Sequence, residues 1–146
     1  MVVLIVLSGT VLHAVQSNAL ESAVRRQLQM KAEYTYHLLA NAMVENSGRS
    51  YLRTLAEGLL ENRTEGPCRE VAPILEEVRP HGFVVEVRME REDGGCVSVR
   101  IPENAGEPGD VFTFSGRFAL VSAGENPEDG MNVRVFEVRV SLVRAA

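Results

Sequence analysis

The first twenty residues of the chain, MVVLIVLSGTVLHAVQSNAL, contain no Asp, Glu, Lys or Arg, although these residues make up 24% of the whole sequence. A helix of this length reaches roughly 30 Å, the thickness of the hydrocarbon core of a bilayer. Three interpretations compete for the segment. A secretory signal peptide has a basic region and a small-residue cleavage site, which this stretch lacks. A buried core helix needs only about 10–14 apolar residues, so the segment favours a membrane-spanning or membrane-like helix.

The orientation of such a segment depends on the basic residues around it. Arg25 and Arg26 follow the segment, and no basic residue precedes it in the sequence. Positively charged flanks favour the cytoplasmic side, which alone would place the rest of the chain in the cytoplasm. A basic leader in front of Met1 would reverse that expectation.

After the uncharged segment, apolar residues recur at three- or four-residue steps, which predicts an amphipathic helix. These residues are Leu20, Val24, Leu28, Ala32, Tyr36 and Leu39. No Pro or Gly lies between Thr10 and Gly48, so we expect one long helix that is apolar all round at its start and ends near Gly48. Two shorter helices are predicted over residues 50–62 and 69–78, with Gly66-Pro67 as the break between them.

From Phe83 the apolar period changes to two, which indicates strands. Residues 83–90 and 97–101 flank a turn at 92–95 and predict a hairpin. Two further strands are expected over 111–122 and 131–142, with bulges at Gly116 and between Val135 and Phe136. The predicted fold class is therefore α+β, with a long N-terminal hydrophobic helix and short helices packed on a four-stranded antiparallel sheet, which we expect to be a meander.

Two parts are expected: an apolar segment, residues 1–20, and an α+β head domain, residues 21–146. The amphipathic half of the long helix should pack on the sheet. We expect four helix residues to be substantially buried against four strand residues. The helix residues are Leu28, Leu38, Leu39 and Met43, and the strand residues are Val85, Val87, Val138 and Val140.

Composition and motifs give no support for an enzyme. A net charge of −5 provides no broad basic field for nucleic acid. The three histidines, His13, His37 and His81, lie at no spacing typical of a metal site or a catalytic pair. No phosphate-binding loop, dinucleotide fingerprint or EF-hand pattern occurs. We therefore predict no catalytic residue, no cofactor and no metal ligand.

Three residues are candidates for covalent modification. If the head lies outside the cytoplasm, Cys68 and Cys96 are expected to form one disulfide that joins the third helix to the second strand, the alternative being two unrelated buried thiols. Asn62 begins the sequon Asn62-Arg63-Thr64, which makes it a glycosylation candidate in an exported protein.

An uncharged helix that continues as an amphipathic helix and is followed by an antiparallel sheet resembles the layout of type IV pilin-like proteins, which include pilins, pseudopilins and archaeal pilin or archaellin relatives. Residues 1–20 and their continuation, 21–44, carry the resemblance, and the strands from 83 to 142 agree in order. Such precursors carry a basic leader ending in a small residue, which is not seen before Met1. Many bacterial pilins also have a glutamate near the start, and its absence from residues 3–7 favours an archaeal relative.

The resemblance implies a subunit that waits in the membrane and then forms a homo-oligomer, a surface filament or related secretion assembly, through its N-terminal helices. The residues expected to make the helix–helix contacts are Val3, Leu4, Leu7, Val11 and Val15. One alternative is a single-span membrane-anchored extracytoplasmic binding domain that does not polymerise. Another is a soluble protein whose first helix is buried.

Overall fold

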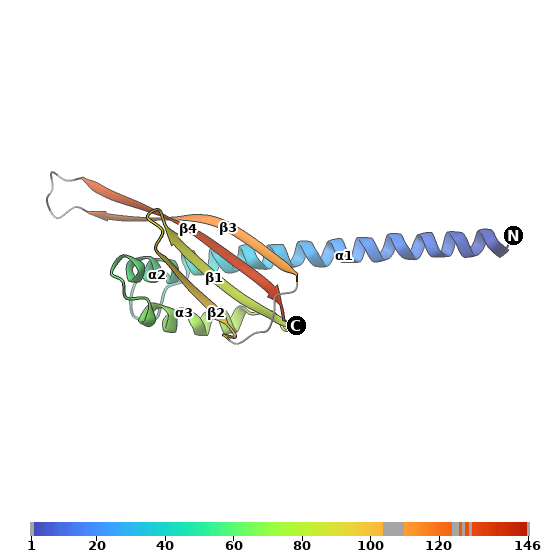
Figure 1. Cartoon of the computed structure of the whole chain (residues 1–146), viewed down its shortest axis with the longest axis horizontal. Coiled ribbons are helices and arrows are strands. Elements are labelled where there is room, and N and C mark those ends of the chain that lie inside the picture. The colour runs from blue at the N-terminus through green and yellow to red at the C-terminus, as the bar shows by residue number, and fades with distance from the viewer. Residues whose placement is uncertain (1, 104–109, 124–125, 127, 129, 146) are drawn as a thin grey trace.

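In a computed structural model the chain is an α+β protein with three helices and a four-stranded antiparallel sheet (Figure 1). The elements are α1 (Val2–Asn41), α2 (Tyr51–Leu60), α3 (Glu65–Val78), β1 (Phe83–Arg91), β2 (Cys96–Ile101), β3 (Val111–Ala123) and β4 (Met131–Arg144). The structure describes residues 2–103, 110–123, 126, 128 and 130–145, and of residues 2–15, 17 and 123 it describes the backbone alone. The predicted order, helices followed by an antiparallel sheet, is confirmed.

The strand order is β2-β1-β4-β3, so the prediction of a meander was wrong. β1–β2 and β3–β4 are hairpins, and the sheet forms because β4 pairs antiparallel with β1 as well as with β3. The inner residues of β4, Val138, Val140 and Leu142, are almost completely buried. A central position buries these side chains between neighbours on both sides, which an edge position in a meander would not do.

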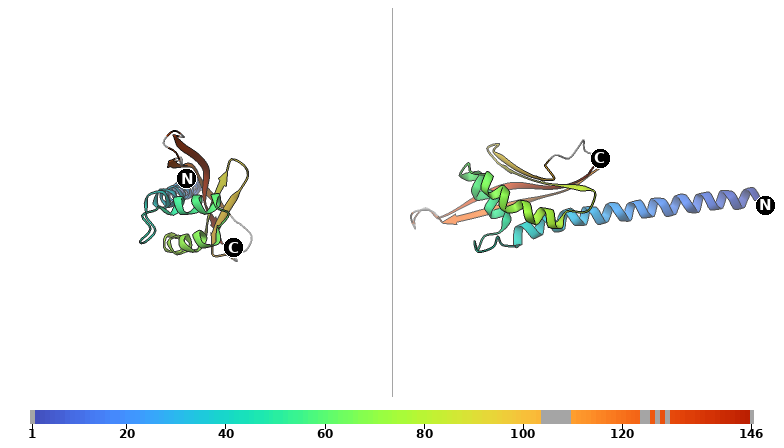
Figure 2. Two further views of the ribbon diagram at one scale, coloured as in Figure 1. Left: turned by 90° about the vertical axis from the view of Figure 1, so that its left-hand side faces the viewer. Right: turned by 90° about the horizontal axis from the view of Figure 1, so that it is seen from below.

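All three helices lie on one face of the sheet (Figure 2). The core forms between that face and the helices, and it includes Leu39 of α1, Leu55 of α2 and Leu75 of α3. Strand residues that point inward alternate with residues on the outer face, as the period of two requires. The inward positions of β1 and β2 are Val85, Val87, Met89, Val97 and Val99, all buried.

The predicted packing of α1 on the sheet is confirmed for Leu39, which is fully buried, while Leu28 and Leu38 are half-buried. The prediction for Met43 was wrong, because 66% of its surface is exposed. α1 ends at Asn41, whose side-chain amide donates to the carbonyl oxygen of His37 at 2.8 Å.

The chain after α1 forms a tight turn in place of the expected last helical turns. The backbone N–H of Val44 donates to the carbonyl oxygen of Arg49 at 2.8 Å, and Met43 pairs with Ser50. Asn46 and Gly48 have φ values of 61° and 66°, which a right-handed helix cannot contain. Ser50 then caps α2 by accepting a hydrogen bond from the backbone N–H of Arg53 at 3.2 Å.

α3 begins earlier than predicted, because Gly66-Pro67 lies in its first turn and does not interrupt it. The first-turn N–H groups of a helix have no acceptor within the helix, so a proline there costs little. Pro67 packs against Gly58 of α2, where a Cβ would lie only 2.6 Å from the proline Cγ. The corner between α2 and α3 therefore depends on a glycine.

Neither predicted bulge is present, since the pairing of β3 with β4 runs without interruption through Gly116 and Phe136. The change of apolar phase has another cause. Phe136 is the first β4 residue that pairs with β1, through Arg91, and from there inward side chains enter the core. Before Phe136 the apolar residues Met131 and Val133 lie on the outer face and are exposed.

Candidate interaction surfaces

α1 covers one edge of the sheet. The side-chain amide of Gln29 donates to the carbonyl oxygen of Thr113 at 2.8 Å, and the Tyr36 hydroxyl donates to the carbonyl oxygen of Arg117 at 2.9 Å. Seven residues of helix span about 10.5 Å and four residues of strand about 13 Å, so α1 runs parallel to β3 over this distance. A covered edge cannot pair with another strand.

Tyr36 fits against β3 because residue 116 is glycine. A Cβ at Gly116 would lie 2.6 Å from Cζ of Tyr36 and 2.9 Å from its hydroxyl oxygen. The tyrosine ring also packs on Phe114, with ring centroids 5.1 Å apart. Burial raises the pKa of the Tyr36 hydroxyl, which keeps it protonated as a hydrogen-bond donor.

The β3–β4 hairpin extends beyond this covered edge as a two-stranded ribbon, which we call the distal ribbon and define as residues 119–123 and 131–135 (Figure 1). Outward-pointing backbone groups recur at every second residue, so those of Ala119 and Val121 continue the edge past the last contact with α1. β4 has no second neighbour here, because β1 ends opposite Phe136.

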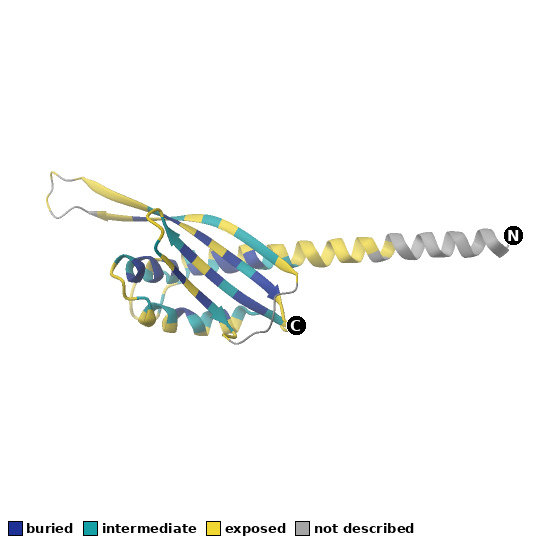
Figure 3. Cartoon of the chain, in the orientation of Figure 1, coloured by how far each residue is buried: buried dark blue, intermediate teal, exposed yellow. Residues whose placement is uncertain are grey.

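One face of the distal ribbon is apolar, and Figure 3 shows the ribbon as exposed over most of its length. Val121 pairs directly with Val133, and Met131 lies two residues before Val133 on the same face. These three side chains have between 51% and 78% of their surface exposed. A two-stranded ribbon is marginally stable in water on its own, and an apolar face is typical of a surface that binds another element.

A second exposed apolar surface lies on α1, and we call it the α1 stripe: Leu20, Val24, Met30 and Tyr34, with 41% to 68% of their surface exposed. At about 100° per residue these four positions fall within an arc of about 120°. The centre of that arc lies about 120–140° from the core-facing residues Leu39 and Ala32, and its edge at Val24 adjoins the direction of Thr35. Arg26 and Lys31 border or interrupt the stripe, and within the described part of the chain neither has a carboxylate partner.

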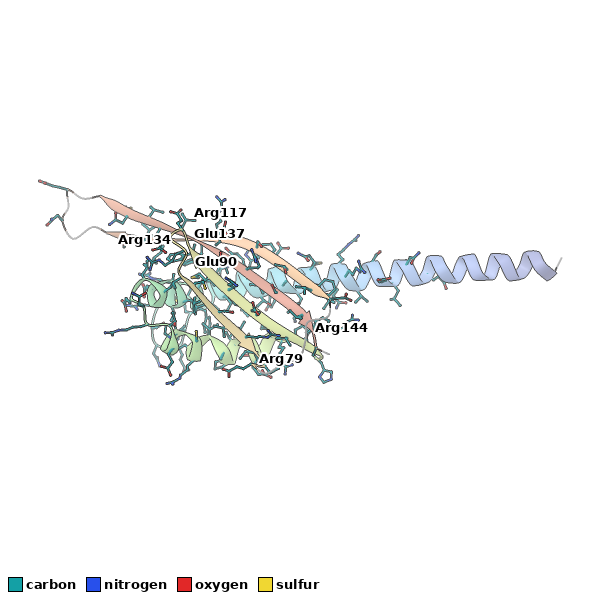
Figure 4. The ribbon with its side chains drawn as sticks, viewed as in Figure 1. Arg79, Glu90, Arg117, Arg134, Glu137 and Arg144 are labelled. Carbon is teal, nitrogen blue, oxygen red and sulfur yellow. The ribbon has the colours of Figure 1, made fainter. Side chains whose placement is uncertain are left out.

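The outer face of the sheet is charged rather than apolar. Arg88 lies opposite Arg139, and Glu90 lies opposite Glu137, which in turn lies opposite Arg117 (Figure 4). Like charges directly opposite each other repel, and the neighbouring row of opposite sign offsets this, as in the 2.8 Å contact between Arg88 and Glu90. These groups are solvent-exposed in large part, so each pair contributes at most about 1 kcal/mol to stability.

The residues predicted to make helix–helix contacts, Val3, Leu4, Leu7, Val11 and Val15, belong to α1, and their side chains lie outside the described residues. The same holds for His13 and for most of the predicted membrane segment. Within the described residues, no helix is both long enough and apolar enough to cross a membrane. The assembly contacts therefore stay a prediction.

The predicted disulfide is absent, because Cys68 and Cys96 are both free thiols. Cys96 pairs with Glu90 and precedes the inward-pointing Val97, so its side chain lies on the outer face of the sheet. Cys68 is on α3, which packs on the opposite face. The prediction correctly placed Cys96 at the start of β2 but did not consider which face of the strand its side chain occupies.

The sequon residue Asn62 is exposed at the end of α2 and has a φ of 56°. It borders an open hollow of about 680 Å³ at the α2–α3 corner, lined also by Glu57, Glu61, Glu65 and Glu70. An exposed turn suits an acceptor asparagine, and glycosylation stays a prediction.

The described cysteines and histidines are not arranged as an activated nucleophile or a metal site would be. Burial raises the pKa of the Cys68 thiol, which is opposite to the change that activates a cysteine nucleophile. His37 and His81 are exposed, and His37 lies 3.7 Å from Glu33 on the same helix. Among the described residues no three His, Cys, Asp or Glu side chains are grouped as a metal site would require.

The structure thus leaves two apolar surfaces exposed: the distal ribbon, and the α1 stripe, which runs from beside β3 at Tyr34 out along the part of α1 that leaves the head. The sequence analysis missed the ribbon as a surface, although the change of apolar phase before Phe136 was its signal. Comparison of the chain with protein-family models, with curated proteins and with solved structures found no match.

Proposed function

We propose that the chain is a structural subunit of a surface filament of the type IV pilus-like kind, or of a related secretion assembly, and that it polymerises through its N-terminal apolar helix. In this proposal residues 1–20 hold the subunit in the membrane before assembly and pack against the same segment of other copies afterwards. The resemblance of the layout to pilin-like proteins motivates the proposal.

The observation that supports it is the way α1 leaves the head. The described side chains between positions 16 and 27 are all exposed, and contacts with the sheet begin at Leu28 and Gln29. The helix before that point, residues 2–27, is about 39 Å long at 1.5 Å per residue. The first twenty residues of the chain have no charged side chain. An apolar segment with no head to pack against needs lipid or other copies around it.

The proposal is tested by placing a charge in the apolar segment of the full chain. Leu7→Glu should abolish filaments seen by electron microscopy and should reduce the membrane-bound fraction of the protein. An unpaired carboxylate in an apolar environment is strongly disfavoured, which is the reason for the expected loss. Met43→Glu is the matched control, because it also replaces an apolar residue with an acid, at a side chain already exposed on the head.

Circular dichroism of both variants separates assembly from folding, since the head should keep its α+β spectrum in each. Filaments from Leu7→Glu at the unaltered concentration would contradict the proposal. Membrane retention of the unaltered chain without filaments under any condition would favour the single-span binding domain instead. A stable monomer of the full chain in plain buffer would contradict both.

A further inference from the structure

We propose that the distal ribbon of one copy binds the α1 stripe of the next copy, so that head domains associate head to tail. This inference rests on the proposed assembly and names a second contact within it, outside residues 1–20. The two surfaces are the apolar face formed by Val121, Met131 and Val133, and the helix side formed by Leu20, Val24, Met30 and Tyr34.

The first argument is placement. Leu20 and Val24 of the stripe precede the first contact of α1 with β3, at Gln29, and the distal ribbon follows the last, at Arg117, so in one copy they lie at opposite ends of the head (Figure 1). They meet only if a second copy follows along the same direction. A contact between two different surfaces leaves one of each free at the ends, so it adds further copies and does not close as a two-fold dimer does.

The second argument is shape and length. The five residues of each ribbon strand span about 17 Å, and the fourteen-residue span of the α1 stripe measures about 20 Å. A flat two-stranded face on a helix side is an ordinary packing of secondary structure, and both sides here carry large apolar residues, with Gln27 and Lys31 as polar positions within the stripe. Covering the ribbon would also add the layer that an isolated two-stranded hairpin lacks.

The third argument is charge. The segment that joins the ribbon strands, residues 124–130, contains three acidic residues and no basic one, and Glu128 among them is exposed. The stripe is bordered by Arg26 and contains Lys31 within its arc, and in the described part of the chain neither is ion-paired. The acidic end of the ribbon therefore complements Lys31 within the stripe, whereas two ribbons facing each other would repel at their ends.

Cysteine cross-linking of the full chain tests the contact. Cys68 and Cys96 are first replaced by Ser, and two proteins are then made, one with Val133→Cys and one with Val24→Cys. Mixed, assembled and mildly oxidised, they should give a covalent heterodimer between positions 133 and 24, identified by mass spectrometry of the linked peptides. Met43→Cys in place of Val24→Cys is the control, and it should give no link to position 133.

Homodimers through position 133 alone would mean that ribbons pair with ribbons, and homodimers through position 24 alone would mean that only helices meet. Either result overturns the inference. Filaments without the 133–24 link also overturn it and leave the proposed function standing. The link without filaments supports the head-to-tail contact and counts against the proposed function. A monomer without any link contradicts both.

A charge exchange gives a second measurement that does not depend on cysteines. Lys31→Glu and Glu128→Lys should each raise the concentration at which the chain assembles by about two- to fivefold, because each leaves two like charges facing one another. The double variant should return to the unaltered value. Val133→Glu should raise the same concentration by about tenfold or more. If the double variant assembles only at the same raised concentration as the single variants, the two residues do not face each other, and the inference is overturned.

Discussion

Gly116→Ala should destabilise the head domain by about 1.5–4.5 kcal/mol. The added Cβ would lie 2.6 Å from Cζ, 2.8 Å from Cε2 and 2.9 Å from the hydroxyl oxygen of Tyr36. Forcing a methyl group into a packed site costs about 1–3 kcal/mol. A displaced ring would also lose the hydrogen bond from Tyr36 to the carbonyl of Arg117, which is worth about 0.5–1.5 kcal/mol.

Urea unfolding of the full chain, followed by circular dichroism, measures the change as a shift of the midpoint at constant slope. Gly66→Ala is the control, because apart from its two chain neighbours a Cβ at Gly66 meets no atom within 4 Å and the position is helical. That control should change stability by less than about 1 kcal/mol, since the better helix propensity of alanine is opposed by the contact of its Cβ with the ring of the following Pro67.

The cause is tested by repeating the substitution beside Tyr36→Leu. Leucine lacks the three tyrosine atoms that clash with the added methyl group, so Gly116→Ala should then cost close to nothing, and the two changes should be coupled by more than about 1 kcal/mol. A cost below about 0.5 kcal/mol in the unaltered protein, or the same cost in both backgrounds, would refute the packing of Tyr36 against Gly116.

Three further outcomes follow from the structure. Leu39→Ala should cost about 2–5 kcal/mol in urea unfolding, because Leu39 is fully buried, and an unchanged midpoint would contradict its place in the core. A hydrogen bond from the backbone N–H of Gly95, together with the nearby Arg91, lowers the pKa of the Asp93 carboxyl below 3.8. The ionised carboxylate therefore stabilises the turn above pH 3.8, and this contribution is lost as the pH falls through the lowered pKa. An NMR titration of the Gly95 amide should report this pKa, and a midpoint at or above 3.8 would contradict the interaction. An aromatic disulfide reagent should label the exposed Cys96 before the partly buried Cys68, whose pKa is raised by burial, and an intact mass two units below that of the reduced chain would instead reveal a disulfide.

Features that depend on neighbouring residues in the sequence were predicted well. The hairpin around residues 92–95 follows from alternation on both sides of a Gly-containing turn, and β1 and β2 were found where this pattern placed them. The amphipathic face of α1 was also correct at Leu39, because the helical period fixes which residues share a side.

Features that depend on distant parts of the chain were not predicted. The strand order depends on which strands occupy the buried central positions of the sheet. β4 occupies one of them, although it is the last strand in the sequence. Residue 116 must be glycine because the ring of Tyr36, eighty positions earlier in the sequence, packs against it. Without that contact in view, the glycine was interpreted as a bulge. The wrong disulfide had a local remedy, since counting residues from Cys96 to the inward-facing Val97 places the thiol on the outer face.

The same misses limited the candidate surfaces. The exposed apolar residues Met131 and Val133 were placed in a strand without being assigned to either face, because apolar alternation does not tell which face of a strand is covered. Only the end of β1 opposite Phe136 reveals that the last part of the hairpin has no sheet beside it.

The notch at Gly116 also has a mechanical meaning. A pull on the N-terminus of α1 acts along the helix axis, and this axis runs parallel to β3, so the helix resists by sliding rather than by peeling away. Sliding by two strand positions toward the start of β3 would drive the Tyr36 ring from Gly116 against Phe114, the next side chain on the same face. The hydrogen bonds of Gln29 and Tyr36 to the strand would be strained together and not one after the other. The tyrosine thus acts as a stop that transmits tension from the helix into the sheet.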